Sequence, residues 1–265
     1  MKTVDLLKEN DMKILKSIAV AFSMYSRIPM PRFVWAGEDM KYHLIFFPWI
    51  GIVIASLEYL WMYVCKYFDI GKEPFALIAV VIPLLITGGF HVDGFMDTSD
   101  ALSSWQEKDK RLEILKDPHI GAFSVINLLV AVLILLSAVL MMNEKSFCFW
   151  IVSFFIARTV SGISVIKIKN AKKDGLLNTE SRTASTEVVF IFLLIELFIG
   201  FGYMLYLSAV LAVVQILAWG LFWGYFKKMA LDKFGGITGD LAGWFVTVGE
   251  VIAAVISGIG AIWYL

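Results

Sequence analysis

Long apolar segments separated by short polar ones dominate the sequence. Several apolar segments run for about 20 residues, which is the length an α-helix needs to cross a hydrocarbon core of about 30 Å. Unbroken apolar runs favour helices over the alternating pattern of a membrane barrel. We therefore expect seven membrane helices, at His43–Cys65, Pro74–Gly89, Ile120–Met142, Phe147–Ile166, Val188–Tyr206, Ser208–Phe226 and Leu241–Leu265.

Two segments depart from this pattern. Ile14–Ile28 is apolar but short and contains Lys16, so we expect an interfacial or half-inserted helix there. The run at Pro74–Gly89 is also short, and Gly88-Gly89 is expected to break it. With no repeat or linker, residues 1–265 are predicted to form one all-α domain, a polytopic integral membrane helical bundle.

Composition supports a membrane protein. Hydrophobic residues make up 59% of the chain and charged residues 17%, whereas soluble domains average about 25% charged residues. The net charge is zero, which argues against nucleic acid as a partner. Cys65 and Cys148 lie in or beside apolar runs, so neither a disulfide nor a cysteine metal site is expected.

Basic residues indicate the orientation in the lipid bilayer. If seven helices span, alternate polar segments share one side of the membrane, and they contain 19 of the 23 Lys and Arg residues. Those segments are 1–42, 91–118, 167–187 and 227–240. The positive-inside rule places them in the cytoplasm. We therefore expect a multi-pass protein of the cell membrane whose chemistry faces the cytoplasm.

Three aspartates carry the strongest chemical signal. Asp93, Asp97 and Asp100 are spaced i, i+4 and i+7, so they share one face of a helix, where like charges repel. A cation would neutralise them, and oxygen-only ligands favour a hard ion such as Mg²⁺ or Mn²⁺. A solvated acidic helix face is the alternative. One of these aspartates, or the adjacent His91, could instead act as a general base; His91 could equally be a ligand or a structural hydrogen-bonding group.

Further candidates surround this motif. Arg111 and Lys116 could bind a pyrophosphate or lie in a solvated loop. The glycine-rich segment 235–239 precedes a predicted helix, where free backbone N–H groups would suit phosphate. Within and beside it, the candidates for substrate or metal binding are Gly236, Thr238 and Asp240, with Asp240 alternatively a helix N-cap.

Four of the ionisable residues inside predicted membrane helices are candidates for a role, because charge there is expensive and usually functional. Arg158 and Glu250 could pair with each other, or Arg158 could bind phosphate. Glu58 and Glu196 are also intramembrane, but no motif surrounds either one.

In combination, these motifs resemble the cobalamin synthase family, also called adenosylcobinamide-GDP ribazoletransferases. The resemblance covers nearly the whole chain in the expected order. The segments that carry it are Ser26–Pro31, Phe46–Gly51, Gly88–Leu102, Lys116–Phe123, Ala157-Arg158 and Gly235–Asp240. Departures are Ser26 for the usual Thr, Ala101 for the usual Gly, and Thr247 where the family often has an acid.

The resemblance implies a Mg²⁺-dependent reaction between adenosylcobinamide-GDP and α-ribazole, or its 5′-phosphate, that releases GMP. It implies Mg²⁺ on Asp93, Asp97, Asp100 and Asp240. It also implies phosphate binding by Arg27, Arg111, Lys116 and Arg158, with Glu250 in the same site. The general base would be one of the carboxylates or His91. A homo-oligomer is compatible with the sequence.

Two other functions fit less well. Membrane CDP-alcohol phosphotransferases also use spaced aspartates, but their pattern needs Ala-Arg shortly after Asp-Gly, and Asp93-Gly94 lacks it. A cation-coupled transporter would use the intramembrane charges, but it predicts two related halves, which the sequence does not contain.

Overall fold

The computed structural model describes residues 2–31, 33–35, 37–171 and 186–263, and apart from one isolated β-bridge its regular elements there are helices. This confirms the predicted all-α class. The elements are α1 Lys2–Tyr25, η1 Gly37–Met40, α2 His43–Tyr67, α3 Lys72–Thr87, α4 Phe90–Ser103, α5 Lys108–Ile114, α6 Ala122–Met141, α7 Glu144–Ile151, α8 Ser153–Lys167, α10 Thr186–Leu207, α11 Ala209–Met229, η2 Ala230–Phe234 and α12 Gly239–Trp263.

Six stretches are long and apolar enough to cross a membrane. They match six of the seven predicted spans: α2, α6, α7 with α8, α10, α11 with η2, and α12. The seventh predicted span is α3, which has only 16 residues and is followed by α4 at an angle of 96°. The chain is therefore a polytopic membrane protein with six spans, or seven if α3 and α4 together form a broken one.

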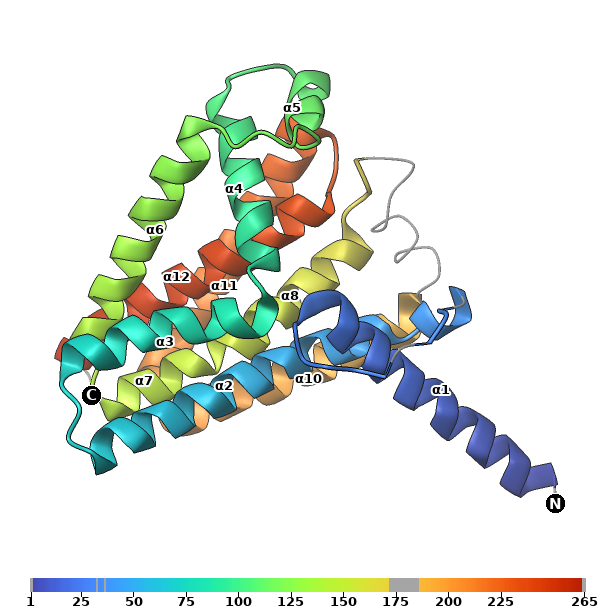
Figure 1. Ribbon diagram of the computed structural model, residues 1–265, viewed down its shortest axis with the longest axis horizontal. Helices are drawn as coiled ribbons and strands as arrows, with labels where there is room; N and C mark the ends of the chain where they lie inside the picture. The colour runs from blue at the N-terminus through green and yellow to red at the C-terminus, as the bar shows by residue number, and fades with distance from the viewer. Residues whose placement is uncertain (1, 32, 36, 172–185, 264–265) are drawn as a thin grey trace.

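Two glycines make the turn between α3 and α4. Gly88 has φ 68° and Gly89 has φ 81°, a left-handed conformation that L side chains disfavour. The Thr87 hydroxyl donates to the carbonyl oxygen of Pro83 at 2.8 Å and accepts from the N–H of Gly89 at 3.3 Å. The expected break at Gly88-Gly89 is confirmed, and it directs α4 away from α3 (Figure 1).

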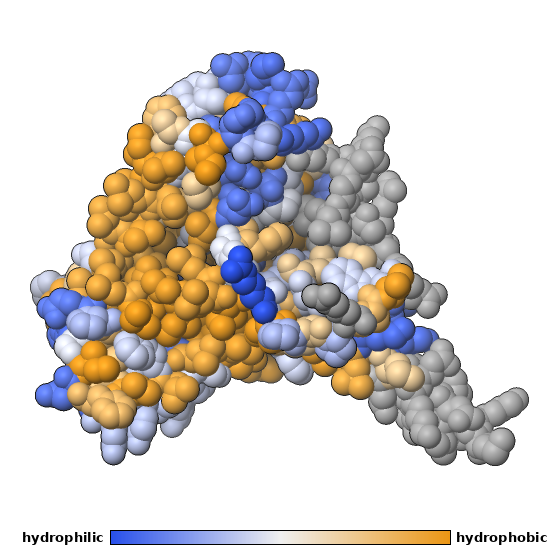
Figure 2. Space-filling model, viewed as in Figure 1, coloured by the Kyte–Doolittle hydropathy of each residue, from blue (hydrophilic) through white to orange (hydrophobic). Residues whose placement is uncertain are grey.

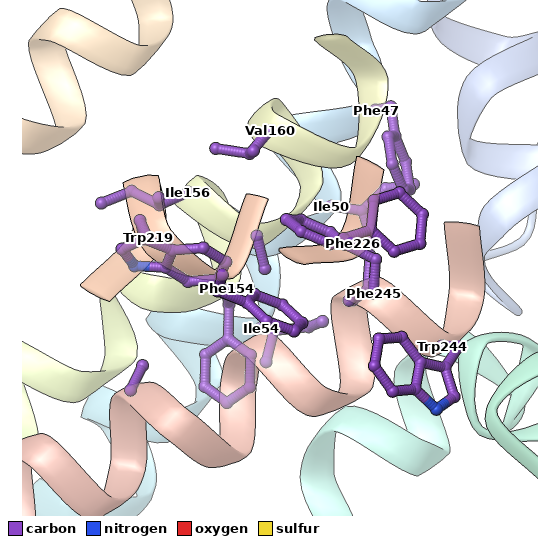
Figure 3. Close-up of a cluster of buried hydrophobic side chains, with 14 of the residues drawn as sticks. Phe47, Ile50, Ile54, Phe154, Ile156, Val160, Trp219, Phe226, Trp244 and Phe245 are labelled. Atoms are coloured by element: carbon purple, nitrogen blue, oxygen red, sulfur yellow. The ribbon is translucent and has the colours of Figure 1, made fainter. Parts of the chain in front are cut away.

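The span formed by α7 and α8 is the most enclosed. Of its most apolar stretch 89% is buried, against 17% for α6. Figure 3 shows the packing around α8, where Phe154 and Ile156 lie among side chains of α2, α11 and α12. The other labelled side chains are Phe47, Ile50 and Ile54 of α2, Val160 of α8, Trp219 and Phe226 of α11, and Trp244 and Phe245 of α12.

The outer surface is divided by polarity. Figure 2 shows hydrophobic side chains spread over α3 and α6 and hydrophilic ones gathered around α5. Exposed apolar residues such as Leu129, Leu133 and Phe123 of α6 would be costly in water but suit lipid. The exposed apolar surface therefore lies on helices that are predicted to cross the membrane.

The first helix extends beyond the expected apolar segment. α1 packs on α2, where the buried ring of Tyr25 lies against those of His43 and Phe47, and α1 is outside the six spans. The chain leaves helical geometry after Tyr25 instead of at Ile28. Interfacial placement of α1 remains a prediction.

A close helix crossing generates a test of this fold. A Cβ at Gly51 of α2 would overlap the Phe154 backbone of α8, whereas one at Gly202 of α10 would meet nothing within 4 Å. Gly51→Ala should therefore lower the melting temperature in detergent, since the clash outweighs the roughly 1 kcal/mol that Ala gains over Gly in a helix. Gly202→Ala, the matched control, should leave it unchanged or raised. Equal melting temperatures for the two variants would contradict the crossing.

Candidate active site on α4 and α12

The acidic face of α4 is the centre of the candidate site. Asp93 is exposed, and Asp97 and Asp100 are half-buried. Helix α4 spans Phe90–Ser103, so the three side chains lie on one helical face as the spacing predicted. The motif is thus presented by a rigid helix and not by a loop.

Small residues bring α4 against the start of α12. A Cβ at Gly94 would lie 2.7 Å from the carbonyl oxygen of Asp240, and one at Gly243 would lie 3.0 Å from the carbonyl oxygen of His91. At Gly94 only glycine leaves room for the opposing backbone, and at Gly243 a side chain would make an unusually tight contact. The contact places Asp240 beside the aspartates of α4, although it is 140 residues away from Asp100 in sequence.

The four carboxylates act on one another electrostatically. The pKa of Asp97 is raised to about 6, first by burial and then by the charges of Asp93, Asp240 and Asp100. Each neighbour that raises the pKa of an acid disfavours its charged form. The arrangement therefore concentrates negative charge in a way that a bound cation would relieve.

The four carboxylates provide the kind of ligand atom that a hard divalent cation prefers. All four supply oxygen, and Mg²⁺ prefers oxygen ligands. Within the described part of the chain, no three acidic, histidine or cysteine side chains are already close enough to hold an ion alone. Mg²⁺ usually takes only one or two protein carboxylates and completes its shell with water and substrate phosphates. The cluster fits an ion that arrives with a phosphorylated substrate.

Asp100 connects this cluster to α6. Its carboxylate occupies the space where a Cβ would stand at Gly121, just before α6. The hydroxyl of Ser124 donates to the carbonyl oxygen of Gly121 at 2.6 Å. Gly121 is therefore needed for space beside Asp100, a role that its place in the motif did not reveal.

His91 lies behind the acidic face. It is 5% exposed, and its ring contacts Phe47 and Phe90. Burial, and then the charge of Arg158, hold its pKa well below the usual range, so the ring is neutral. Neither ring nitrogen has a hydrogen-bond partner among the described residues. A neutral, enclosed imidazole is poorly placed to meet a polar substrate.

Arg27 lies over the turn that begins α4. Its side chain fills the space beside Gly88, and its backbone N–H donates to the carbonyl oxygen of Ile86 at 2.8 Å. The side chain is exposed. A positive charge thus stands at the α3–α4 turn, one helical turn before Asp93.

The two basic candidates that follow α4 differ in environment. Arg111 is 7% exposed, and its Nη1 donates to the carbonyl oxygen of Lys233 at 3.4 Å, which ties α5 to η2. Its Nε has no partner among the described residues. Arg111 is therefore not part of a solvated loop, whereas Lys116 is exposed between α5 and α6.

The glycine-rich segment was expected to offer free backbone N–H groups to phosphate, but three of these groups are hydrogen-bonded within the protein. The N–H groups of Gly235, Gly236 and Ile237 donate to the carbonyl oxygens of Leu231, Ala230 and Lys169 at 2.9–3.1 Å.

These N–H groups are therefore not free for phosphate. Asn170 and Ile237 form an isolated parallel bridge, and a Cβ at Gly236 would overlap the backbone at Lys169–Ala171. Gly236 instead permits a close backbone crossing.

Thr238 begins α12. Its hydroxyl accepts from the N–H of Leu241 at 3.2 Å and lies 3.4 Å from an Asp240 carboxylate oxygen. Thr238 therefore serves as a cap for the helix. This leaves the Asp240 carboxylate beside α4 as a candidate ligand.

Arg158 and Glu250 form a buried ion pair. Arg158 Nη1 lies 2.7 Å from Glu250 Oε1 and also donates to the carbonyl oxygen of Phe154 at 2.8 Å. Glu250 lies ten residues after Asp240, which is about 15 Å along α12. The pair therefore stands deeper in the bundle than the acidic cluster, and mutual pairing is the alternative that the structure shows.

Glu58 lies near this pair and is fully buried. Its carboxylate oxygens have no hydrogen-bond partner among the described residues, and it interacts electrostatically with Glu250. Sequence reasoning ranked Glu58 low because no motif surrounds it. Only the tertiary structure, which brings it within electrostatic range of Glu250, reveals its position.

Comparison with known proteins gives one consistent result. A family model described as cobalamin-5-phosphate synthase matches residues 17–258. A protein of Lachnoclostridium phytofermentans named adenosylcobinamide-GDP ribazoletransferase is 41% identical, over 96% of this chain and 98% of its own length. Proteins of the same name from Clostridium perfringens (SM101) and Clostridium botulinum (Alaska E43) are 30% and 31% identical, over at least 90% of this chain and 95% of their own. No solved structure matches the chain.

The buried ion pair generates a double-mutant test. Arg158→Met or Glu250→Gln alone should each destabilise the protein, by about 3–5 kcal/mol where one charge is left unpaired. The double variant Arg158→Met/Glu250→Gln should lose less than the sum of the two single losses, as unfolding in detergent would measure. Additive losses would show that the two side chains do not depend on each other.

Proposed function

The chain belongs to the cobalamin-5-phosphate synthase family, and from this membership we propose that it is an adenosylcobinamide-GDP ribazoletransferase. Its substrates are then adenosylcobinamide-GDP and α-ribazole or α-ribazole 5′-phosphate. The products are adenosylcobalamin, or its 5′-phosphate, and GMP. The acidic cluster of α4 and α12 is the observation that supports placing this reaction here.

The proposed reaction is one phosphoryl transfer. A ribose hydroxyl of the acceptor attacks the phosphorus that is bonded to cobinamide. The bond from that phosphorus to the bridging oxygen breaks, and GMP leaves with this oxygen. The hydroxyl proton passes to a base. Such transfers depend mainly on positioning and on stabilising negative charge.

We propose Asp93, Asp97, Asp100 and Asp240 as the residues that hold Mg²⁺. When bound, Mg²⁺ supplies positive charge to the pyrophosphate oxygens. The four carboxylates would hold the ion, and the contact between α4 and α12 keeps their spacing constant. Burial and the neighbouring carboxylates raise the pKa of Asp97 to about 6, which suits a proton acceptor better than the buried His91 does.

Phosphate contacts are proposed for the basic residues at the edge of the site. Arg27 and Lys116 are exposed; the Arg27 side chain lies against the turn before α4, and Lys116 is on the loop before α6. Arg111 would act at the edge of the site only through its unpartnered Nε. Arg158 is excluded from this set because its charge is already paired with Glu250.

We propose that the site faces the cytoplasm. The segments beside it carry most of the Lys and Arg residues, which the positive-inside rule places there. The soluble, charged substrates would reach the acidic cluster from that side without crossing the bilayer.

Replacement of a central carboxylate tests the proposed reaction. With purified protein, adenosylcobinamide-GDP, α-ribazole and Mg²⁺, the wild type should release GMP, and chelation of the metal should stop it. Asp97→Asn should lower the rate by about a hundredfold or more, because charge stabilisation of the transition state is lost. Asp109→Asn on the exposed side of α5 is the control, and its rate should equal that of the wild type. GMP release by Asp97→Asn at the wild-type rate would refute the site.

The raised pKa of Asp97 gives a second test. Its pKa of about 6 means that protons compete with a cation as the pH falls through 6. The affinity for Mn²⁺, followed by electron paramagnetic resonance, should weaken about fourfold between pH 7.5 and pH 5.5 from this group alone. Asp97→Asn should bind Mn²⁺ more weakly and lose that part of the pH dependence. An unchanged pH dependence in the variant would show that Asp97 is not a ligand.

A further inference from the structure

A groove of about 590 Å³ lies on the lipid-facing side of the bundle, away from the acidic cluster. It runs between α8, α10 and α11, three elements of predicted membrane spans. Its walls are almost wholly apolar, with Phe190, Leu194, Leu197 and Phe201 along α10. These four residues cover eleven helical steps, or about 16 Å. The groove is therefore long enough and apolar enough for a hydrocarbon chain.

Two lysines stand at one end of this groove. Lys167 is in the last turn of α8 and Lys227 in the last turn of α11, and both side chains are exposed. Lys167 Nζ lies 3.6 Å from the centre of the Phe190 ring, and Lys227 Nζ lies 5.4 Å from that of Trp223. Neither ammonium forms an ion pair with a carboxylate in the described ranges. The apolar groove thus ends in two positive charges.

The floor of the groove contains an unpaired donor. Trp219 is 4% exposed and lines the groove, and its indole N–H has no hydrogen-bond partner among the described residues. Figure 3 shows its ring beside Ile156 of α8. A buried N–H without an acceptor is costly.

We propose that this groove binds an anionic glycerophospholipid. One acyl chain would lie along α10 and α11, and the phosphate would lie between Lys167 and Lys227. Basic residues beside membrane helices attract acidic lipid headgroups on the cytoplasmic side, which is the side predicted for both lysines. A zwitterionic lipid would fill the same volume but gain less from the two charges. The lipid would stabilise α10 against α8 and α11.

Helix α11 offers a matched pair of substitutions. Gly220 lines the groove, and a Cβ there meets nothing within 4 Å, so Gly220→Leu would fill the groove without a clash at its Cβ. Gly224 also has open space around it but does not line the groove. Gly224→Leu therefore controls for the change in helix propensity and apolar surface.

The experiment is native mass spectrometry of the full chain after exchange into lipid mixtures. Equal amounts of phosphatidylglycerol and phosphatidylcholine are supplied, and retained lipid is counted. The wild type should retain phosphatidylglycerol about tenfold over phosphatidylcholine. Lys167→Gln/Lys227→Gln should lose this preference, and Lys167→Arg/Lys227→Arg should keep it. Gly220→Leu should retain less of either lipid, while Gly224→Leu should match the wild type.

Several results would overturn the proposal. Equal retention of the two lipids by the wild type, or an unchanged preference in Lys167→Gln/Lys227→Gln, would exclude a headgroup site at the lysines. Unchanged retention in Gly220→Leu would exclude the groove. If Gly220→Leu instead abolished a dimer, the occupant would be a second copy of the chain. Melting temperatures of all variants in one detergent separate lost binding from lost folding.

Discussion

Gly94 and Gly243 let the backbones of α4 and α12 approach until each glycine faces a main-chain carbonyl of the other helix. The acidic site depends on this contact, because it brings Asp240 to the face that carries Asp97. A side chain at Gly94 would push the two helices apart and move Asp240 away from the aspartates of α4. The same contact sets the depth of His91 beneath the surface. Packing and chemistry therefore share one constraint, and a repacked crossing would change both.

Charge inside the bundle follows a different rule from charge at its surface. The acidic cluster is half-exposed and can be neutralised by an ion that arrives with substrate. Arg158 and Glu250 are enclosed, so each must be neutralised by the other within the fold. The acidic cluster is thus available to bind a ligand, whereas the Arg158–Glu250 pair holds helices of the bundle together. This difference also explains why Arg158, the most buried arginine among the described residues, is not among the groups proposed to hold phosphate.

Much of the architecture was predictable because lipid imposes simple requirements on length and polarity. Six spans and the break at Gly88-Gly89 were predicted, since apolar run length and consecutive glycines act locally. The glycine-rich segment at 235–237 was misjudged. Its composition resembles that of a phosphate-binding loop, but its N–H groups donate to the backbone carbonyl oxygens of Leu231, Ala230 and Lys169. Lys169 is distant in sequence, so no local pattern could show that pairing. The burial of Arg111 could not be predicted for the same reason, because its partner Lys233 lies far along the chain.

By itself, the sequence determined the membrane class, the aspartate face of α4 and the family, since each of these is carried by a local pattern of residue types. The tertiary structure decided which distant groups meet. It placed Asp240 with Asp97, paired Arg158 with Glu250, enclosed His91 and opened a groove beneath Lys167 and Lys227. The physical reason is that periodicity specifies the face on which a side chain lies, whereas its partner depends on how closely two helices approach. That distance is set by the small residues at each crossing.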